Sequence, residues 1–319
     1  MADLHRDDKQ PNSALMSDSA HSPSIDVVIP VFNRSAELAR ALDSLTCQTD
    51  PNFGIIICDD GSSEDISAVT CLYKDRLTID LVRIENSGGP ARPRNVATSR
   101  SNADWISFLD SDDYWYPERM AAVRDALTSD CDLVYHLLRE ERPSPQTYGS
   151  QNEDIIIGNA LQVGDPIVHM LRFGNPIPTS ACTVRRRSLT DIGGFEESQS
   201  LASVEDFDAW LRVCAAGARL KCVESALGAY WVGDDQISTF SVKQMTRQEN
   251  LFRRQMELLP PQYRELAASN FNYLLGSYAI ALGLPNARQY YSLVSFRLEP
   301  LRWLKARAKI LRAVSQAVS

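Results

Sequence analysis

The amino-acid sequence predicts an α/β fold with a mainly parallel sheet covered by helices on both faces. Two observations lead to this class. Short segments are apolar throughout, as strands are when both of their faces are buried, and they alternate with segments whose apolar residues recur at helical spacing. A chain of 319 residues can form one large core, or a main domain with an appendage.

The predicted parallel strands lie in the first half of the chain. Residues 25–29 form the first strand, which Pro30 ends. Ser35 is the predicted N-cap of the following helix, whose leucines share one face: Leu38, Leu42 and Leu45. Further strands are predicted at residues 53–58, 79–84, 105–109 and 133–135. In such sheets ligands bind at the carboxyl ends of the strands, so the polar residues there are the candidates for function.

The second half of the chain predicts fewer strands and more helix. Its expected elements are a polar connection at 137–165, a strand-like segment at 179–187, a helix at 204–216, a strand near 230–232 and largely helical residues at 241–319. No internal repeat is visible.

Composition excludes several classes of function. The net charge of −8 and a pI near 5.1 argue against nucleic acid as the main partner. Seven cysteines without a C-x-x-C pair fit reduced thiols better than a disulfide framework or a zinc site. Residues 1–23 are polar and predict a disordered leader without the apolar core of a signal peptide. The longest nearly apolar run, 274–284, is too short to span a bilayer. We therefore expect a cytoplasmic protein.

The predicted strand at 105–109 runs directly into an acidic cluster. Asp110 and Asp112 are separated by one residue, so a short turn can direct both carboxylates at one point. Such hard oxygen ligands suit Mg²⁺ or Mn²⁺ shared with substrate phosphates. Acidic clusters in loops are more often solvated turn formers, but the apolar strand before this one favours the metal interpretation for Asp110 and Asp112, and leaves Asp113 open.

Two further strand ends carry candidate nucleotide-binding residues. Asp60 follows the second strand and could accept the N–H of a base, whereas Asp59 is at least as well explained as a turn former. Arg94 lies where a glycine-rich loop opens a helix, a natural anion site, although loop arginines are usually solvated. Arg92 is the weaker candidate of the two arginines.

Glu205 and Asp206 begin the predicted helix 204–216. Acids in the first turn complement the helix dipole, and alone that explanation would suffice. Burial of the helix through Trp210 would hold its start rigidly, so a carboxylate there could accept a proton from an attacking hydroxyl.

Together these residues resemble family 2 of the glycosyltransferases, inverting enzymes with a GT-A (Rossmann-like) fold. The resemblance extends from about residue 25 to 238 and depends on six motifs: 28–33, 58–62, 94–95, 108–113, 193–196 and 205–206. It implies that Pro30 and Asp60 contact the base, Asp110 lies near the ribose and Asp112 binds Mn²⁺ or Mg²⁺. Arg94 and Glu205 are then expected beside the bound donor, and Asp206 is the expected catalytic base.

Two departures from the family pattern refine the expectation. Many members carry a histidine near the position of Gly233, so Asp234, Asp235 or water would replace it here. The Q-x-x-R-W motif of processive synthases is missing, and residues 299–303 resemble it only superficially. Single sugar additions are therefore expected rather than polymerisation.

The resemblance implies an organisation and a function. Residues 24–136 would bind the nucleotide sugar, 137–240 would bind the acceptor and supply the base, and 241–319 would form a helical extension. The expected activity is that of a hexosyltransferase-type enzyme, which moves one sugar from a nucleotide-diphosphate sugar, UDP being favoured, to a saccharide or lipid-linked acceptor in cell-surface polysaccharide or glycolipid biosynthesis. Two alternatives are a catalytically silent binding or assembly protein on the same fold and a sugar-phosphate nucleotidyltransferase. The latter usually has a glycine-rich basic loop after the first strand, which residues 30–34 lack.

The last segment of the chain suggests a further partner. Residues 297–319 carry six basic residues and one acidic residue. Leu304, Ala308, Leu311 and Val318 share one helical face, with most basic residues opposite. This pattern fits peripheral contact with the inner face of an anionic membrane, and equally a helix that packs on the acidic main domain.

Overall fold

The structure, a computed structural model, describes residues 23–142, 155–233 and 241–318. A nine-stranded sheet has the order β3-β2-β1-β4-β8-β6-β9-β5, with β7 paired to β6. The first half comprises β1 (Ile25–Val31), α1 (Ser35–Thr46), β2 (Gly54–Asp59), α2 (Ile66–Cys71), β3 (Ile79–Arg83), α3 (Ala91–Arg100), β4 (Trp105–Phe108), β5 (Tyr114–Trp115), α4 (Arg119–Ala126) and β6 (Leu133–Glu141). The second comprises β7 (Ile156–Ile157), α5 (Pro166–Phe173), η1 (Thr179–Ala181), β8 (Cys182–Arg185), α6 (Arg186–Asp191), η2 (Gln199–Leu201), α7 (Glu205–Ala215) and β9 (Leu220–Trp231).

The sheet is mixed but mostly parallel, which confirms the predicted class. β1 pairs in parallel with β2 and β4, β2 with β3, and β6 with β9. The antiparallel pairs are those that β8 makes with β4 and β6, β5 with β9, and β7 with β6.

Both faces of the sheet are covered, as the continuous apolar strands predict. Val28 of β1 packs into a core with Trp210 of α7, whereas its neighbours Val27 and Ile29 pack into a second core with Leu42 of α1. Successive side chains of a strand point to opposite faces, so an all-apolar strand needs helices on both sides.

Helix α1 confirms its predicted face and corrects its predicted cap. Leu38, Leu42 and Leu45 are all buried. Ser35 is the first helical residue rather than the N-cap, and Arg34 before it makes no side-chain cap. The Ser35 N–H instead donates to Glu64 Oε2 at 2.7 Å, so a carboxylate from another loop satisfies the helix start.

Several other boundaries differ from the prediction. Residues 179–187 form a 3₁₀ turn, the strand β8 and the start of α6 rather than one strand. The strand expected near 230–232 begins at Leu220. The prediction omitted α2, α4 and α5, which are six to eight residues long, and the two-residue strands β5 and β7.

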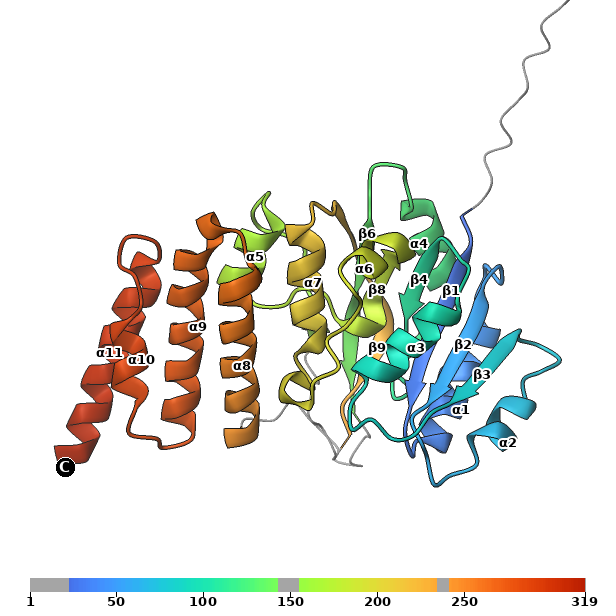
Figure 1. The fold of residues 1–319 in the computed structure, drawn as a ribbon, viewed down its shortest axis with the longest axis horizontal. Helices are drawn as coiled ribbons and strands as arrows, with labels where there is room; N and C mark the ends of the chain where they lie inside the picture. Colours follow the sequence, from blue (N-terminus) through green and yellow to red (C-terminus); the bar gives the residue numbers. More distant parts are fainter. Residues whose placement is uncertain (1–22, 143–154, 234–240, 319) are drawn as a thin grey trace, which may run out of the picture.

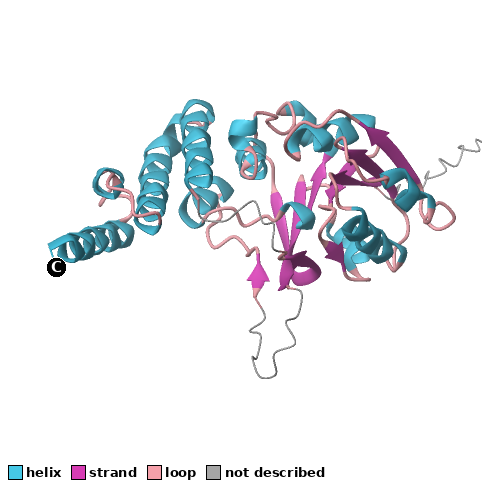
Figure 2. Cartoon of the chain, turned by 90° about the horizontal axis from the view of Figure 1, so that it is seen from below, coloured by secondary structure: helices cyan, strands magenta, loops and turns pink. Residues whose placement is uncertain are grey.

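The expected helical end of the chain is confirmed by α8 (Val242–Leu258), α9 (Pro261–Ala281), α10 (Ala287–Ser292) and α11 (Pro300–Val318). Figures 1 and 2 show these helices arranged in a row that extends from α7 away from the sheet. Among the described residues, none of the helices combines the length and the apolar character needed to cross a bilayer. The predicted leader, apart from residue 23, lies outside the described residues.

Candidate active site

A cleft of about 770 Å³ opens where several strands end, a size within the usual range for small-molecule sites. It collects side chains from distant parts of the sequence. They include Asn33 and Arg34 after β1, Arg94 of α3, Asp110, Asp112 and Asp113 after β4, Asn175 and Thr179 before β8, Glu205 and Asp206 of α7, Tyr230 of β9, and Arg247 of α8.

The acidic cluster after β4 divides into two kinds of residue. Asp110 and Asp112 face the cleft, with 30% and 31% of their side chains exposed. Asp113 is buried, where it accepts hydrogen bonds from the Ser180 hydroxyl and from the Trp231 N–H at 2.9 Å. The Ser180 hydroxyl also accepts the Asp110 N–H at 3.0 Å. Asp113 therefore ties β9 to this loop, and each of its carboxylate oxygens already accepts a hydrogen bond from the protein.

The cleft carboxylates fit a divalent cation. Burial, followed by the charge of Asp110, raises the pKa of Asp112, and a bound cation would relieve both costs. Among the described residues no group of three His, Cys, Asp or Glu side chains could hold a metal ion. Two carboxylates therefore suit a cation that completes its shell with substrate phosphates and water, as Mg²⁺ commonly does. Asp112 is now ion-paired with Arg34, which would have to turn away.

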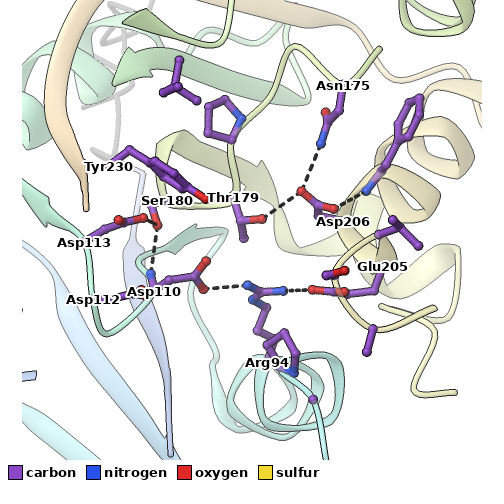
Figure 3. Close-up of a pocket in the computed structure, with 18 of the residues that line it drawn as sticks. Arg94, Asp110, Asp112, Asp113, Asn175, Thr179, Ser180, Glu205, Asp206 and Tyr230 are labelled. Carbon is purple, nitrogen blue, oxygen red and sulfur yellow. Dashed lines mark hydrogen bonds and ion pairs between the residues drawn. The ribbon is translucent and has the colours of Figure 1, made fainter. Parts of the chain in front are cut away.

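Arg94 joins the two sides of the cleft (Figure 3). Its guanidinium is buried and pairs with Asp110 at 2.6 Å and with Glu205 at 2.7 Å. Burial lowers the pKa of Arg94, but the charges of Asp110 and Glu205 outweigh this and leave it raised. Within the described part of the chain, Arg94 Nε and Glu205 Oε2 have no hydrogen-bond partner. Arg94 and Glu205 both line the cleft, but their charged groups pair with each other. A contact of either residue with a bound sugar donor therefore stays a prediction.

Asp206 lies at the start of α7 and faces the same cleft. Its Oδ2 accepts hydrogen bonds from Asn175 Nδ2 at 3.0 Å and from the Thr179 hydroxyl at 3.2 Å, and its Oδ1 accepts the Phe207 N–H at 2.7 Å. Burial, followed by the charge of Glu205, raises the pKa of Asp206 to about 7. A carboxylate with this pKa exchanges protons near neutral pH, as a general base should.

Backbone strain marks two corners of the cleft. Asn33 and Ser203 are the non-glycine residues with positive φ, 50° and 71°, among those described, and both line the cleft. The side chain of Asn33 accepts the Ser63 N–H at 2.7 Å, and the Ser203 hydroxyl donates to Gln244 Oε1 at 2.8 Å. Strain of this kind persists only where surrounding contacts enforce it, and it tends to gather at functional sites.

Two predicted nucleotide contacts are not part of the cleft lining. Pro30 lies within β1, and the backbone N–H of Asp60 donates to Val31 O at 2.8 Å beside it. Both carboxylate oxygens of Asp60 are occupied by Ser87, through its N–H at 2.9 Å and its hydroxyl at 3.0 Å. A base contact by Pro30 or Asp60 stays a prediction. Asp59 accepts the Ser62 N–H at 2.8 Å, as a turn former should.

Some cleft residues were missed by the sequence analysis. Arg34 lies three residues after the end of β1, and this position beside a strand end is a signal in the sequence that could have identified it. Asn175 and Thr179 lie in a proline-rich stretch without periodicity, and Arg247 lies in the C-terminal helices, so no local pattern identified them. Arg247 donates to Ser203 Oγ at 3.1 Å, and its buried Nε has no hydrogen-bond partner among the described residues. Gly233 lines the cleft, whereas Asp234 and Asp235, its suggested substitutes for the family histidine, lie outside the described residues.

Comparison with known proteins finds glycosyltransferases among the relatives of this chain. The Glycosyl transferase family 2 model matches residues 26–193. An uncharacterized glycosyltransferase of Haemophilus influenzae is 30% identical over 200 residues, which are 59% of this chain and 61% of that protein. The poly(ribitol-phosphate) beta-N-acetylglucosaminyltransferase TarS of Staphylococcus aureus is 33% identical over 114 residues, 34% of this chain and 20% of TarS. The matches thus span less than two thirds of these relatives' own length.

Solved structures resemble the fold over most of the chain. TarS of S. aureus in complex with UDP-GlcNAc superposes with a TM-score of 0.60 and 18% identity, covering 90% of this chain and 88% of that one. The mannosyltransferase PcManGT of Pyrobaculum calidifontis, with GDP-Man and Mn²⁺, superposes with a TM-score of 0.62 and 15% identity, covering 94% and 82%. At these identities the likeness concerns the fold alone, which is GT-A-like.

Proposed function

The chain belongs to glycosyltransferase family 2, and from that premise we propose that it transfers a single sugar from a nucleotide-diphosphate sugar to an acceptor hydroxyl, with inversion at the anomeric carbon. One observation carries the proposal: the pair Asp110 and Asp112 and the carboxylate of Asp206, with its pKa of about 7, line the same cleft. This chemistry needs carboxylates that can hold a cation for the donor diphosphate and a group that accepts a proton. The presence of both kinds of residue in one cleft, on separate elements, supports the proposal.

Asp206 acts as the general base. It removes the proton from the acceptor hydroxyl as the hydroxyl oxygen bonds to the anomeric carbon, and the bond from that carbon to the diphosphate breaks on the opposite face. Asn175 and Thr179 hold the Asp206 carboxylate in place through Oδ2. A positioned base typically contributes about 10²–10⁴-fold in rate. A divalent cation, Mn²⁺ or Mg²⁺, held by Asp112 with Asp110 beside it, would offset negative charge on the departing diphosphate.

The donor and acceptor are proposed in more general terms. A UDP sugar is favoured, which agrees with the UDP-GlcNAc bound by TarS, although PcManGT holds GDP-Man. A saccharide or lipid-linked hydroxyl is the proposed acceptor, in the synthesis of a cell-surface polysaccharide or glycolipid.

Calorimetric titration would test the donor class directly. UDP, GDP, dTDP and CMP would each be added with and without Mn²⁺. We expect one diphosphate to bind, and binding to weaken strongly without the cation. If none of the four bound, the silent binding protein would replace the transferase as the better explanation.

The variant Asp206→Asn tests the base. Asparagine keeps the size of the side chain and an acceptor oxygen for Asn175 and Thr179, and loses only the acceptor of the Phe207 N–H. We expect sugar transfer to fall by about 10²–10⁴-fold while the dissociation constant of the nucleotide stays within error. Asp191→Asn, on a carboxylate that is 62% exposed, is the matched control. Transfer by Asp206→Asn at the wild-type rate would remove this residue from the mechanism.

A further inference from the structure

Helix α11 packs against α9 through a face that carries basic side chains. Ala306 is buried, Lys309 donates to Ser277 Oγ at 3.1 Å, and Arg302 donates to Asn270 Oδ1. The Lys309 ammonium also lies 5.0 Å from the centre of the Tyr273 ring. Two basic side chains of the helix are therefore directed into the protein, toward α9.

The opposite face of α11 is apolar and uncovered. Leu301, Leu304 and Leu311 are 73%, 53% and 71% exposed, and the exposed Ala308 lies between them on the same stripe. Phe296, just before the helix, is exposed and packs edge-on against Trp303 with ring centroids 5.2 Å apart. Of the large hydrophobic side chains exposed among the described residues, this short segment holds a disproportionate share. Soluble helices usually turn such a stripe inward.

The stripe is bordered by positive charge. Arg297, Lys305 and Arg307 are exposed beside it, and the one acidic residue of 297–319, Glu299, is already paired with Arg172 at 2.7 Å. The whole chain carries a net charge of −8, so this basic surface is a local departure from its acidic character. Figure 1 shows α11 at the outer end of the row of helices, away from the sheet.

These features favour one kind of binding partner for the exposed face of α11. An amphipathic helix with exposed leucines, basic flanks and an aromatic residue at its edge has the composition of an interfacial membrane helix. We propose that α11, with Phe296, binds to the surface of an anionic membrane, its leucines entering the acyl boundary and its basic residues meeting lipid phosphates. The inward contacts of Arg302 and Lys309 hold the leucines outward, so the surface is preformed. The helix packs on α9 and α10 of the C-terminal helices rather than on the main domain, which was the alternative that the sequence left open. The proposal does not depend on which sugar is transferred.

Vesicle flotation with the full chain tests the proposal. Wild type should float with phosphatidylcholine vesicles that contain phosphatidylglycerol, should float far less with phosphatidylcholine alone, and should be released by salt. Leu301→Glu with Leu304→Glu should weaken binding at least about tenfold, because each leucine loses its burial. Lys305→Ala with Arg307→Ala should weaken it roughly fivefold for each charge removed. Leu72→Glu, at a remote residue that is also 73% exposed, should float like wild type.

Results of two kinds would overturn the proposal. One is wild-type protein that stays unbound with every vesicle, or a double leucine variant that floats unchanged. The other is a wild-type dimer in light scattering that does not float and becomes monomeric when the leucines are replaced, which would assign the stripe to a second copy. Circular dichroism would verify that the variants fold, and nucleotide titration would verify that the cleft is unaffected.

Discussion

Replacing Arg94 with methionine should be among the most damaging single changes in the cleft. The guanidinium is buried and forms both short ion pairs, to Asp110 and to Glu205. Asp110 is 30% exposed, so water can solvate its carboxylate once Arg94 is gone. Glu205 is buried and would keep an uncompensated charge. Breaking a buried pair from one side costs about 3–5 kcal/mol, and we expect the free energy of unfolding to fall by that amount.

Urea unfolding of matched variants measures this cost. Arg94→Met combined with Glu205→Gln removes both buried charges and should recover at least half of the loss. Arg100→Met, in the same helix, removes an exposed pair with Asp80 and should cost about 0–1 kcal/mol. The reasoning fails if Arg94→Met costs no more than Arg100→Met, or if the second substitution recovers nothing.

Four further predictions follow from the cleft and the helices. The pKa of Asp206, about 7, predicts that kcat/KM rises with pH to a plateau with a midpoint near 7. Because the pKa of Asp206 is higher in the folded protein than its ordinary value of 3.8, its protonation stabilises the folded state, fully so below pH 3.8. This contribution is lost as the pH rises to about 7, so Asp206→Asn should gain stability relative to wild type across that interval. A difference in stability that does not change with pH would contradict this. Asp112→Asn should weaken nucleotide binding at least about tenfold in the presence of Mn²⁺, since losing even a neighbour of a metal ligand typically costs about 10–100-fold. Binding should change little without Mn²⁺, as titration would show; equal loss in both conditions would argue against a cation at this residue. A Cβ on Gly276 would lie 2.7 Å from the ring of Tyr291, so Gly276→Ala should lower the melting temperature by an amount equivalent to about 1–3 kcal/mol, whereas the uncrowded Gly164→Ala should not.

The fold could be predicted well because its signal is local. Continuous apolar strands and the leucine face of α1 are visible within windows of a few residues, and both require burial whatever their partners are. The N-cap at Ser35 was wrong for the converse reason. Glu64, which satisfies that helix start, lies 29 residues away and is brought close only by the tertiary structure.

The site could be predicted only in part. The sequence identified Asp110, Asp112 and Asp206 as residues of one site, and the cleft brings their side chains together. It could not show that Arg94 pairs with Glu205, 111 residues away, because a motif does not indicate where a side chain finds its counter-ion. For the same reason the leucine stripe of α11 was visible in the sequence, but not which way it faces.

Helix α9 has a consequence for the choice of acceptor. Leu274 lines the cleft, while its neighbours Tyr273 and Ser277 contact Lys309 of α11. These residues lie within about one turn of α9, so this helix joins the cleft to the proposed lipid-facing surface across its width. Because both surfaces are held on the same turn of one helix, the protein itself would fix the height of the cleft above the bilayer. The enzyme would then select a lipid-anchored acceptor by two properties. One is the identity of its sugar, and the other is the length of the spacer between its lipid and its hydroxyl.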